Sequence, residues 1–292
     1  MTRSGPADML AELGERVAHT GSGPILVHCD VMRALGLLQE RASAQQILDG
    51  HLACLKRLAN ARVTYLPTFN YDYANSGQYD IARSASQVGS LTEHIRRLSA
   101  WRSAVPIFSV CGPEKAPVRE AIPDQVQELD PFGAESIFQH LYDAGAAVLF
   151  YGARFASFTG IHFIERHAGG PLYRYDKLFR GHVAFPDGRV GQTIVNYHVR
   201  PLGQRVEYDF DRLWTLLESD GLGWTYSAPL VDIRCLDFRA AVDRLGQEMQ
   251  QDPFALLTES NRCFWRLEAD RLGRRVQQTD YEPGPNPLVT HA

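Results

Sequence analysis

A histidine and a glutamate stand three residues apart in the segment 159–165, which reads TGIHFIE. In a helix, residues at this spacing share one face, so the Glu165 carboxylate would lie beside the His162 imidazole. A carboxylate in that place orients the imidazole and raises its basicity, which suits a general base. A surface His–Glu pair on a short helix is the alternative, and this segment alone leaves both open. The sequence has no HExxH motif and no second His or Cys at ligand spacing, so no zinc site is expected.

A second segment whose residue types could bind a substrate is 68–79, TFNYDYANSGQY, which is dense in tyrosine and carries one acid. Asp72 could pair with a substrate ammonium group, and the aromatic face of Tyr73 would suit a polyhydroxyl or amino-sugar substrate. The alternative is a loop whose aromatic side chains pack on the edge of a sheet. The residue types do not choose between these two interpretations.

Two candidate helix starts could bind anions through free backbone N–H groups. Asp30 precedes VMRALGLL, and Ser86 precedes VGSLTEHIRRL. Each is equally explained as an ordinary N-cap. The chain has no GxxxxGK[ST], GxGxxG or GxSxG motif, so neither a common nucleotide loop nor a hydrolase nucleophile elbow is predicted. Cys29 and Cys111 are isolated and are expected to be packed thiols.

The predicted secondary structure alternates between strands and helices. Strands are predicted at 24–28, 63–67, 147–152 and 230–235, and helices at 31–38, 44–60, 88–98, 158–167, 210–219 and 238–251. Residues 68–84 are predicted to form a long loop, and the Pro-Asp-Gly turn within 182–199 predicts a hairpin. This order favours an α/β fold with a mixed central sheet covered by helices on both faces. The loops after His28, Pro67 and Gly152 should then meet at one sheet edge.

Composition narrows the class of protein further. The 292 residues are 45% hydrophobic and 22% charged, with a formal charge of −4, which predicts a globular chain and argues against nucleic-acid binding. No apolar run reaches the roughly 18 residues of a membrane span, and the N-terminus lacks a signal-peptide pattern. Five widely spaced cysteines predict a reducing, cytoplasmic setting. One domain over 1–284 with a loose tail at 285–292 is expected, as a monomer or homo-oligomer.

Seven sequence blocks occur in a fixed order over residues 24–200. They are LVHCDVMRALG, YLPTFNYDY, SASQVGSLTEHIRR, RSAVPIFSVCG, DPFGAESIFQHL, VLFYGARFASFTGIHFIE and PLYRYDKLFRG. Each block alone is a weak signal, but the set in this order resembles the aminoglycoside 3-N-acetyltransferase family, also called the antibiotic N-acetyltransferases.

The resemblance implies a three-layer α/β/α sandwich and acyl transfer from an acyl-CoA, commonly acetyl-CoA, to an amine of an amino sugar. His162 matches the family's histidine in T-x-x-H-x-x-E, which implies a general base, and Glu165 matches its glutamate partner. No metal is implied. The family's CoA-side loops match seven positions of this chain, which are Cys29, Asp30, Thr68, Ser86, Val88, Gly89 and Ser109.

Some positions depart from the family pattern. Val105 stands before Pro106 where the family usually has His or Asp, and Cys29 stands where Ser is common. These changes imply an altered rate or acceptor, and they lower the expectation of resistance to common aminoglycosides. The sequence resembles family members that act on pathway amino sugars more than it resembles the resistance enzymes. A non-catalytic CoA-binding member, O-acylation, or thioester hydrolysis on the same scaffold are the alternatives.

Overall fold

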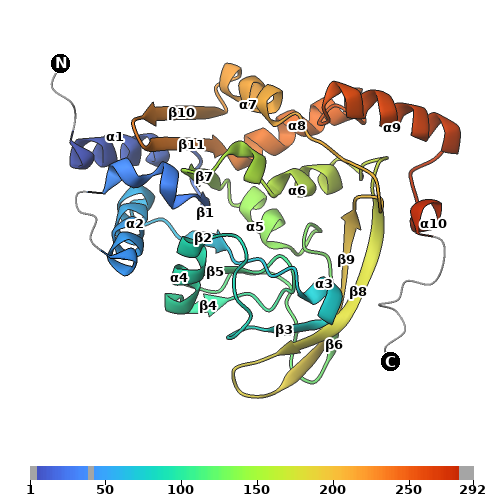
Figure 1. The fold of residues 1–292 in the computed structure, drawn as a ribbon, viewed down its shortest axis with the longest axis horizontal. Helices are drawn as coiled ribbons and strands as arrows, with labels where there is room; N and C mark the ends of the chain where they lie inside the picture. Colours follow the sequence, from blue (N-terminus) through green and yellow to red (C-terminus); the bar gives the residue numbers. More distant parts are fainter. Residues whose placement is uncertain (1–4, 39–42, 283–292) are drawn as a thin grey trace.

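The computed structural model describes residues 5–38 and 43–282, and its centre is a seven-stranded mixed sheet (Figure 1). In spatial order the strands are β10 (Gly223–Ala228), β11 (Val231–Asp237), β7 (Ala147–Tyr151), β1 (Ile25–Cys29), β2 (Thr64–Pro67), β5 (Val110–Gly112) and β4 (Trp101–Arg102). The middle strands β7, β1 and β2 run parallel, and the outer pairs are antiparallel. The predicted mixed central sheet is therefore confirmed.

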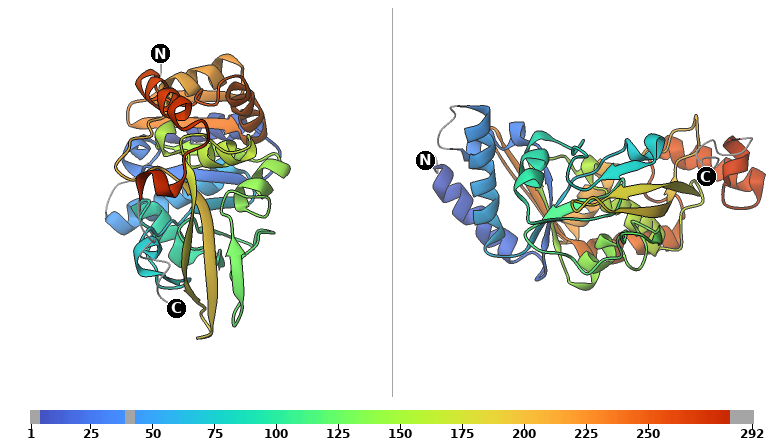
Figure 2. Two further views of the ribbon diagram at one scale, coloured as in Figure 1. Left: turned by 90° about the vertical axis from the view of Figure 1, so that its right-hand side faces the viewer. Right: turned by 90° about the horizontal axis from the view of Figure 1, so that it is seen from below.

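Helices cover both faces of this sheet. One face carries α1 (Pro6–Ala18), α2 (Ala44–Ala59) and α4 (Ser90–Leu98), and the other carries α5 (Ile137–Asp143), α6 (Gly160–His167), α7 (Phe210–Ser219) and α8 (Phe238–Gln251) (Figure 2). Side chains alternate across a strand, so Ile25 and Val27 of β1 enter one cluster and Leu26 enters the other. The predicted three-layer sandwich is confirmed.

A second sheet has four strands in the order β3 (Gln78–Asp80), β8 (Tyr175–Ala184), β9 (Val190–Val199) and β6 (Val126–Leu129). Its centre is the predicted hairpin, with β8 and β9 antiparallel over ten residue pairs. The hairpin lies outside the central sheet. Phe179 and Val195 of this sheet nevertheless share one apolar cluster with Phe150 of the central sheet. The shared core favours the predicted single domain, whereas the predicted tail at 285–292 lies outside the described residues.

Three local predictions are corrected by the structure. Residues 31–38 form two short 3₁₀ turns, Val31–Arg33 and Leu35–Leu37, in place of one helix. The predicted loop 68–84 contains a short helix, α3 (Tyr73–Ser76), and strand β3. Helix α4 begins at Ser90 with Gly89 as its N-cap, so Ser86 is not the cap.

The C-terminal part of the chain adds two helices that the sequence patterns did not predict. They are α9 (Glu259–Leu272) and α10 (Gln278–Tyr281), seen beside the start of β8 (Figure 1). Trp265 of α9 is buried in a small third cluster with Tyr173 and Tyr175. None of the described helices is long and apolar enough to cross a membrane.

The carboxyl ends of the parallel strands meet as predicted. The Asp30 amide donates to the carbonyl of Tyr151 at 2.8 Å, which joins the end of β1 to the end of β7. Gly152 follows with φ of 72°, and a Cβ atom there would lie 2.0 Å from the Asp30 carbonyl oxygen. Only glycine fits this close approach, so it fixes the two loops against each other.

Candidate active site

Helix α6 carries both residues of the His–Glu pair. Its apolar face, with Ile161, Phe163 and Ile164, is buried in the core. A Cβ atom at Gly160 would lie 2.4 Å from the ring of Phe158, so glycine lets the helix start pack tightly against that aromatic side chain. The core therefore fixes how far α6 can rotate, and with it the direction of the polar side chains.

The predicted pair forms at hydrogen-bond distance. His162 Nδ1 lies 3.0 Å from Glu165 Oε2. The Glu165 side chain is 0% exposed, whereas that of His162 is 23% exposed. The alternative of a solvated surface pair is thus excluded for Glu165, and His162 alone has an edge open to a ligand.

Three further polar side chains surround Glu165, and the sequence patterns did not identify them. His198 Nε2 on β9 lies 2.9 Å from Glu165 Oε2, and Tyr208 donates its hydroxyl hydrogen to Oε1 at 2.7 Å. Arg174 Nε lies 3.4 Å from Oε2 and its Nη2 donates to the Tyr208 hydroxyl at 2.8 Å. His198 lies 33 residues from Glu165. No local pattern marked it, because His198 falls on the polar face of the β-like run, opposite Val195 and Tyr197.

These contacts settle the tautomer of His162. A carboxylate only accepts hydrogen bonds, so Nδ1 of His162 must carry the hydrogen that points to Glu165. The Nε2 atom of the neutral ring is then left with its lone pair free. The same reasoning puts the hydrogen of His198 on Nε2, and its buried Nδ1 has no hydrogen-bond partner among the described residues. Of the two imidazoles, only His162 is placed to receive a proton from a ligand.

Burial and charge set the protonation states of the pair. Burial, aided by the cation of Arg174, lowers the pKa of His162 to about 4 against the opposing pull of Glu165. Burial disfavours the Glu165 carboxylate, but Arg174 and the hydrogen bonds from His162 and His198 outweigh it, and the pKa of Glu165 falls well below its usual range. At neutral pH the site therefore holds a neutral His162, an ionised Glu165 and a charged Arg174.

The same cluster has the composition of a metal site. Ligand atoms of His162, Glu165 and His198 all lie within 4.8 Å of one another. The sequence could not show this, because His198 is far along the chain. However, the Arg174 guanidinium lies 3.4 Å from Glu165 Oε2, the oxygen that also faces both imidazoles. A hydrogen-bonded cluster with a neutralising arginine accounts for this arrangement, and repulsion from Arg174 opposes a bound cation.

The wall beside His162 is aromatic and leads to a cavity. The ring of Phe132 meets the His162 ring edge-on at 5.4 Å, and that of Phe108 lies 4.8 Å from Phe132. A cavity of about 330 Å³ lies beyond, and its lining residues include Val105, Phe108, Glu128, Asp130, Glu135 and Asn196. Val105, the departure from the family pattern, thus lines a cavity that carries three carboxylates. Asp130 also binds Arg166 of α6 at 2.8 Å.

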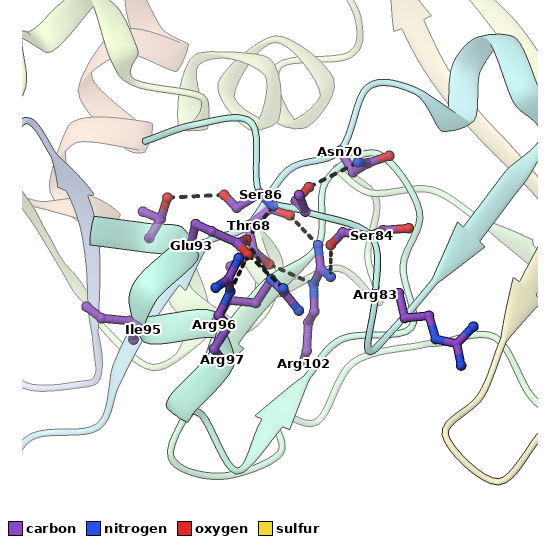
Figure 3. A network of polar contacts seen from close by, with 12 residues as sticks. Thr68, Asn70, Arg83, Ser84, Ser86, Glu93, Ile95, Arg96, Arg97 and Arg102 are labelled. Atoms are coloured by element: carbon purple, nitrogen blue, oxygen red, sulfur yellow. Dashed lines mark hydrogen bonds and ion pairs between the residues drawn. The ribbon is translucent and has the colours of Figure 1, made fainter. Parts of the chain in front are cut away.

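The loop 84–89 before α4 is held by a second, partly buried glutamate, Glu93 (Figure 3). Glu93 accepts from the Ser86 amide at 2.8 Å and binds the guanidinium groups of Arg96 and Arg97. These hydrogen bonds, above all that from Arg96, lower the pKa of Glu93 to about 2. The Ser86 hydroxyl shares a hydrogen bond with that of Thr92. The loop is therefore preformed, with Val88 packed against the main core.

Thr68 and Ser109 lie deeper than the resemblance implied. Both are 0% exposed, and the Ser109 hydroxyl donates to the Thr68 carbonyl at 2.7 Å. The buried Arg102 also donates to Thr68, through Nε to the hydroxyl and through Nη2 to the carbonyl (Figure 3). Their side chains show no surface to a ligand here. Their role in binding a cofactor stays a prediction, and their observed contacts join β2 to the loop after β4.

The remaining predicted site residues differ in their exposure to solvent. Asp30 is exposed and caps the 3₁₀ turn after β1 by accepting from the Met32 amide at 3.1 Å. Cys29 is half-buried, and burial raises its thiol pKa, so it is not a ready nucleophile. Asp72 is exposed, but Tyr73 is buried and its hydroxyl shares a hydrogen bond with that of Thr193. Of these two residues, only Asp72 is accessible to an acceptor substrate.

Comparison with known proteins decides the family. The model of the aminoglycoside 3-N-acetyltransferase family matches residues 54–250. This chain belongs to that family. The match includes α6, β9 and the loop before α4, so the Glu165 cluster and the Glu93 cluster both lie within it. None of the curated protein sequences matches the chain.

Solved structures agree on the fold of this aminoglycoside 3-N-acetyltransferase family member. AAC-IIIb in a binary complex with CoASH shares 18% identity at a TM-score of 0.65, covering 85% of this chain and 97% of that one. A mutant of AAC(3)-IVa in complex with apramycin shares 18% at 0.60, covering 87% and 96%. The YokD protein from Bacillus subtilis shares 14% at 0.57, covering 83% and 93%.

Proposed function

We propose that this chain is an acetyl-CoA-dependent N-acyltransferase that acts on an amine of an amino sugar or aminoglycoside-like acceptor, with His162 as general base. One observation carries the proposal. The buried Glu165 carboxylate lies 3.0 Å from His162 Nδ1 and so fixes the ring hydrogen there, which leaves the Nε2 lone pair of this 23% exposed side chain as the base. Family membership and solved relatives that bind CoASH or apramycin support the substrate classes.

The chemistry follows from these protonation states. The acceptor nitrogen attacks the thioester carbonyl and loses its proton to His162 Nε2. The new N–C bond forms as the C–S bond breaks, and His162 returns the proton to the departing thiolate of CoA. While His162 carries that proton, the ionised Glu165 stabilises the imidazolium. Glu165 itself keeps its hydrogen bonds to His198 and Tyr208, so the base does not turn during the reaction.

The donor side is supported by the start of α4. No side chain among the described residues caps this nine-residue helix, and its N-cap is Gly89 with φ of 131°. Its first amides are therefore available to polar groups of CoA. A Cβ atom at Gly89 would lie 3.8 Å from the Cys29 carbonyl oxygen, so this helix start adjoins the end of β1. We propose that Asp30 and the loop 86–89 form the CoA-side surface.

The acceptor side is supported by carboxylates. The cavity next to the Phe132 wall is lined by Glu128, Asp130 and Glu135, and Asp72 is exposed on α3's N-terminal side. Amino sugars carry ammonium groups, which such carboxylates attract. Val105 gives the same cavity an apolar contact, which favours an acceptor with an apolar face at that point.

The test measures CoA release from acetyl-CoA over a panel of amino sugars and aminoglycosides, with product mass spectrometry on acceptors that carry both amine and hydroxyl groups. We expect N-acetylated products, and we expect His162→Ala to lower turnover by about 10²–10⁴-fold. His167→Ala is the matched control, because His167 is an exposed imidazole five residues further along the same helix.

Near-normal turnover in His162→Ala with acceptor bound would remove the base assignment. Exclusive O-acetylation would replace the acceptor chemistry. CoA binding without turnover on any amine would favour a non-catalytic member of the family.

A further inference from the structure

The C-terminal segment 258–282 lies beyond the region matched by the family model, which ends at residue 250. It nevertheless reaches the residues just before β8, which include Arg174. The Val276 amide donates to the Leu172 carbonyl at 3.0 Å, and Arg275 Nε donates to the Arg174 carbonyl at 2.7 Å. Two consecutive residues of the segment thus bond the main chain of 172–174 from outside.

Arg275 also begins a row of ion pairs that ends at the candidate acceptor cavity. Its Nη1 lies 3.2 Å from Asp176 Oδ2, and the other oxygen of Asp176 accepts from Arg166 Nη1 at 2.9 Å. Arg166 follows Glu165 on α6, and its Nη2 lies 2.8 Å from Asp130 Oδ2. The row Arg275–Asp176–Arg166–Asp130 therefore ties α6 to the start of β8.

The start of β8 depends on this support because its outer edge is open. Strand β3 pairs with β8 only at residues 182–184, so residues 175–181 have β9 alone as a strand partner among the described residues. Glu282, just after α10, accepts from Lys177 at 2.7 Å and from the Tyr175 hydroxyl. The buried Trp265 and Val276 anchor the segment in the third apolar cluster.

We propose that the segment 258–282 is a positioning clamp for the catalytic cluster, and that Arg275 is its positioning residue, acting through the main chain of Arg174 and the carboxylate of Asp176. Arg275 touches neither Glu165 nor His162. It sets where the Arg174 guanidinium stands, and Arg174 in turn neutralises Glu165 and orients Tyr208. The proposal rests on the proposed function for its kinetic readout, but not for its structural one.

The groups that face His162 define what the clamp changes. They are Glu165 from α6, Arg174 before β8, His198 from β9, Tyr208 before α7 and the ring of Phe132. Of these, only Arg174 is bonded directly to the clamp. Displacing it removes a nearby positive charge from His162, and the ring then accepts a proton more readily.

The test compares Arg275→Met, Arg275→Lys and the matched control Arg274→Met in the full chain. Arg274 is the adjacent arginine, but it pairs with Asp280 at 2.7 Å and makes no contact with residues 172–176 among its hydrogen bonds. The first readout is the NMR titration of the His162 imidazole without any substrate. The second is kcat and KM for acetyl-CoA and acceptor.

We expect Arg275→Met to raise the His162 titration midpoint by about one pH unit, since a neighbouring charge shifts a pKa by about 1–3 units. We expect kcat to fall about 10-fold to 10²-fold with little change in KM for acetyl-CoA, as for a small misplacement of catalytic groups. Arg275→Lys should restore part of both, and Arg274→Met should change neither.

A lower melting temperature in Arg275→Met with an unchanged titration and unchanged kcat would overturn the clamp, because the residue would then be structural only. If Arg275→Met does not fold, Asp176→Asn removes the next charge of the row at constant volume and is held to the same expectations. An active His162→Ala would refute the proposed function, yet the substrate-free titration would still decide the clamp.

Discussion

Glu93 and Glu165 lie on two short helices, and each contacts a partner side chain three residues away. The two glutamates differ in what surrounds them. Glu93 on α4 is bound by Arg96 and Arg97 and by the Ser86 amide. Glu165 on α6 is bound by two imidazoles, a phenol and Arg174. The side chain of Glu93 is 18% exposed, whereas that of Glu165 is 0% exposed.

The difference separates a cluster that only holds a loop in place from a site that can do chemistry. Both carboxylates are held ionised by cations and hydrogen bonds. The arginine partners of Glu93 cannot lose a proton at ordinary pH, so that cluster only fixes a loop. An imidazole partner can change its protonation state, and Glu165 fixes which nitrogen of His162 does so. A lowered carboxyl pKa by itself therefore does not mark a catalytic site, whereas the identity of its partners does.

The two glutamates should respond very differently to the same neutralising substitution. Glu165→Gln should lower turnover by about 10²–10⁴-fold, because the amide no longer fixes the reactive tautomer of His162. Glu93→Gln should keep turnover within a few-fold, because no imidazole depends on it. Steady-state rates with saturating acetyl-CoA and acceptor measure both. Equal losses in the two variants would show that the partners do not distinguish the sites.

The two substitutions should also differ in stability. Glu165→Gln leaves the buried Arg174 cation without its anion and should cost about 3–5 kcal/mol of unfolding free energy. Glu93→Gln breaks pairs with partly exposed arginines and should cost about 1 kcal/mol. Denaturant unfolding followed by circular dichroism measures both. A cost for Glu93→Gln as large as for Glu165→Gln would contradict the contrast in burial.

The two sites should lose stability in different acid windows. The pKa of His162 is lowered from 6.5 to about 4, so the unfolded chain binds this proton first and stability falls as pH drops from about 6.5 to 4. The pKa of Glu93 is lowered from 4.5 to about 2, so its contribution is complete above about 4.5 and is lost between 4.5 and 2. Unfolding free energies of His162→Asn and Glu93→Gln, each relative to the parent chain across pH 2–8, test the two windows.

The pKa of His162 can also be measured directly in the folded protein. The His162 imidazole, assigned by its loss in His162→Asn, should titrate near pH 4 by NMR. A midpoint at the ordinary value of about 6.5 would mean that burial and Arg174 do not act on it as the structure indicates.

The smallest expected effect concerns the loop that Glu93 holds. CoA or acetyl-CoA at about 100 times its Kd should stabilise the native state by roughly 2.7 kcal/mol, visible as a rise in melting temperature. Glu93→Gln loosens the loop 84–89 and should weaken this shift, whereas Glu165→Gln should leave it intact. No shift with any acyl-CoA in a folded sample would remove the donor side of the proposed function.

Local patterns predicted much of the framework because they depend on neighbours in sequence. The apolar spacing of 44–60, 210–219 and 238–251 predicted helices α2, α7 and α8, and the Pro-Asp-Gly turn predicted the β8–β9 hairpin. The predictions that were wrong lie where tertiary contacts override propensity. Residues 31–38 are held as two tight turns by bonds such as that from the Gly36 amide to the Leu230 carbonyl.

The sequence alone determined the α/β class, the His162–Glu165 pair and its placement on one helix face, because each needs only composition, strand and helix periods, and a spacing of three. Tertiary contacts were needed to bury Glu165 fully, to surround it with His198, Arg174 and Tyr208, and to turn Thr68 and Ser109 inward. Those groups come from elements far apart in the chain. Their meeting is fixed by how the second sheet packs against the central sandwich, which no local pattern encodes.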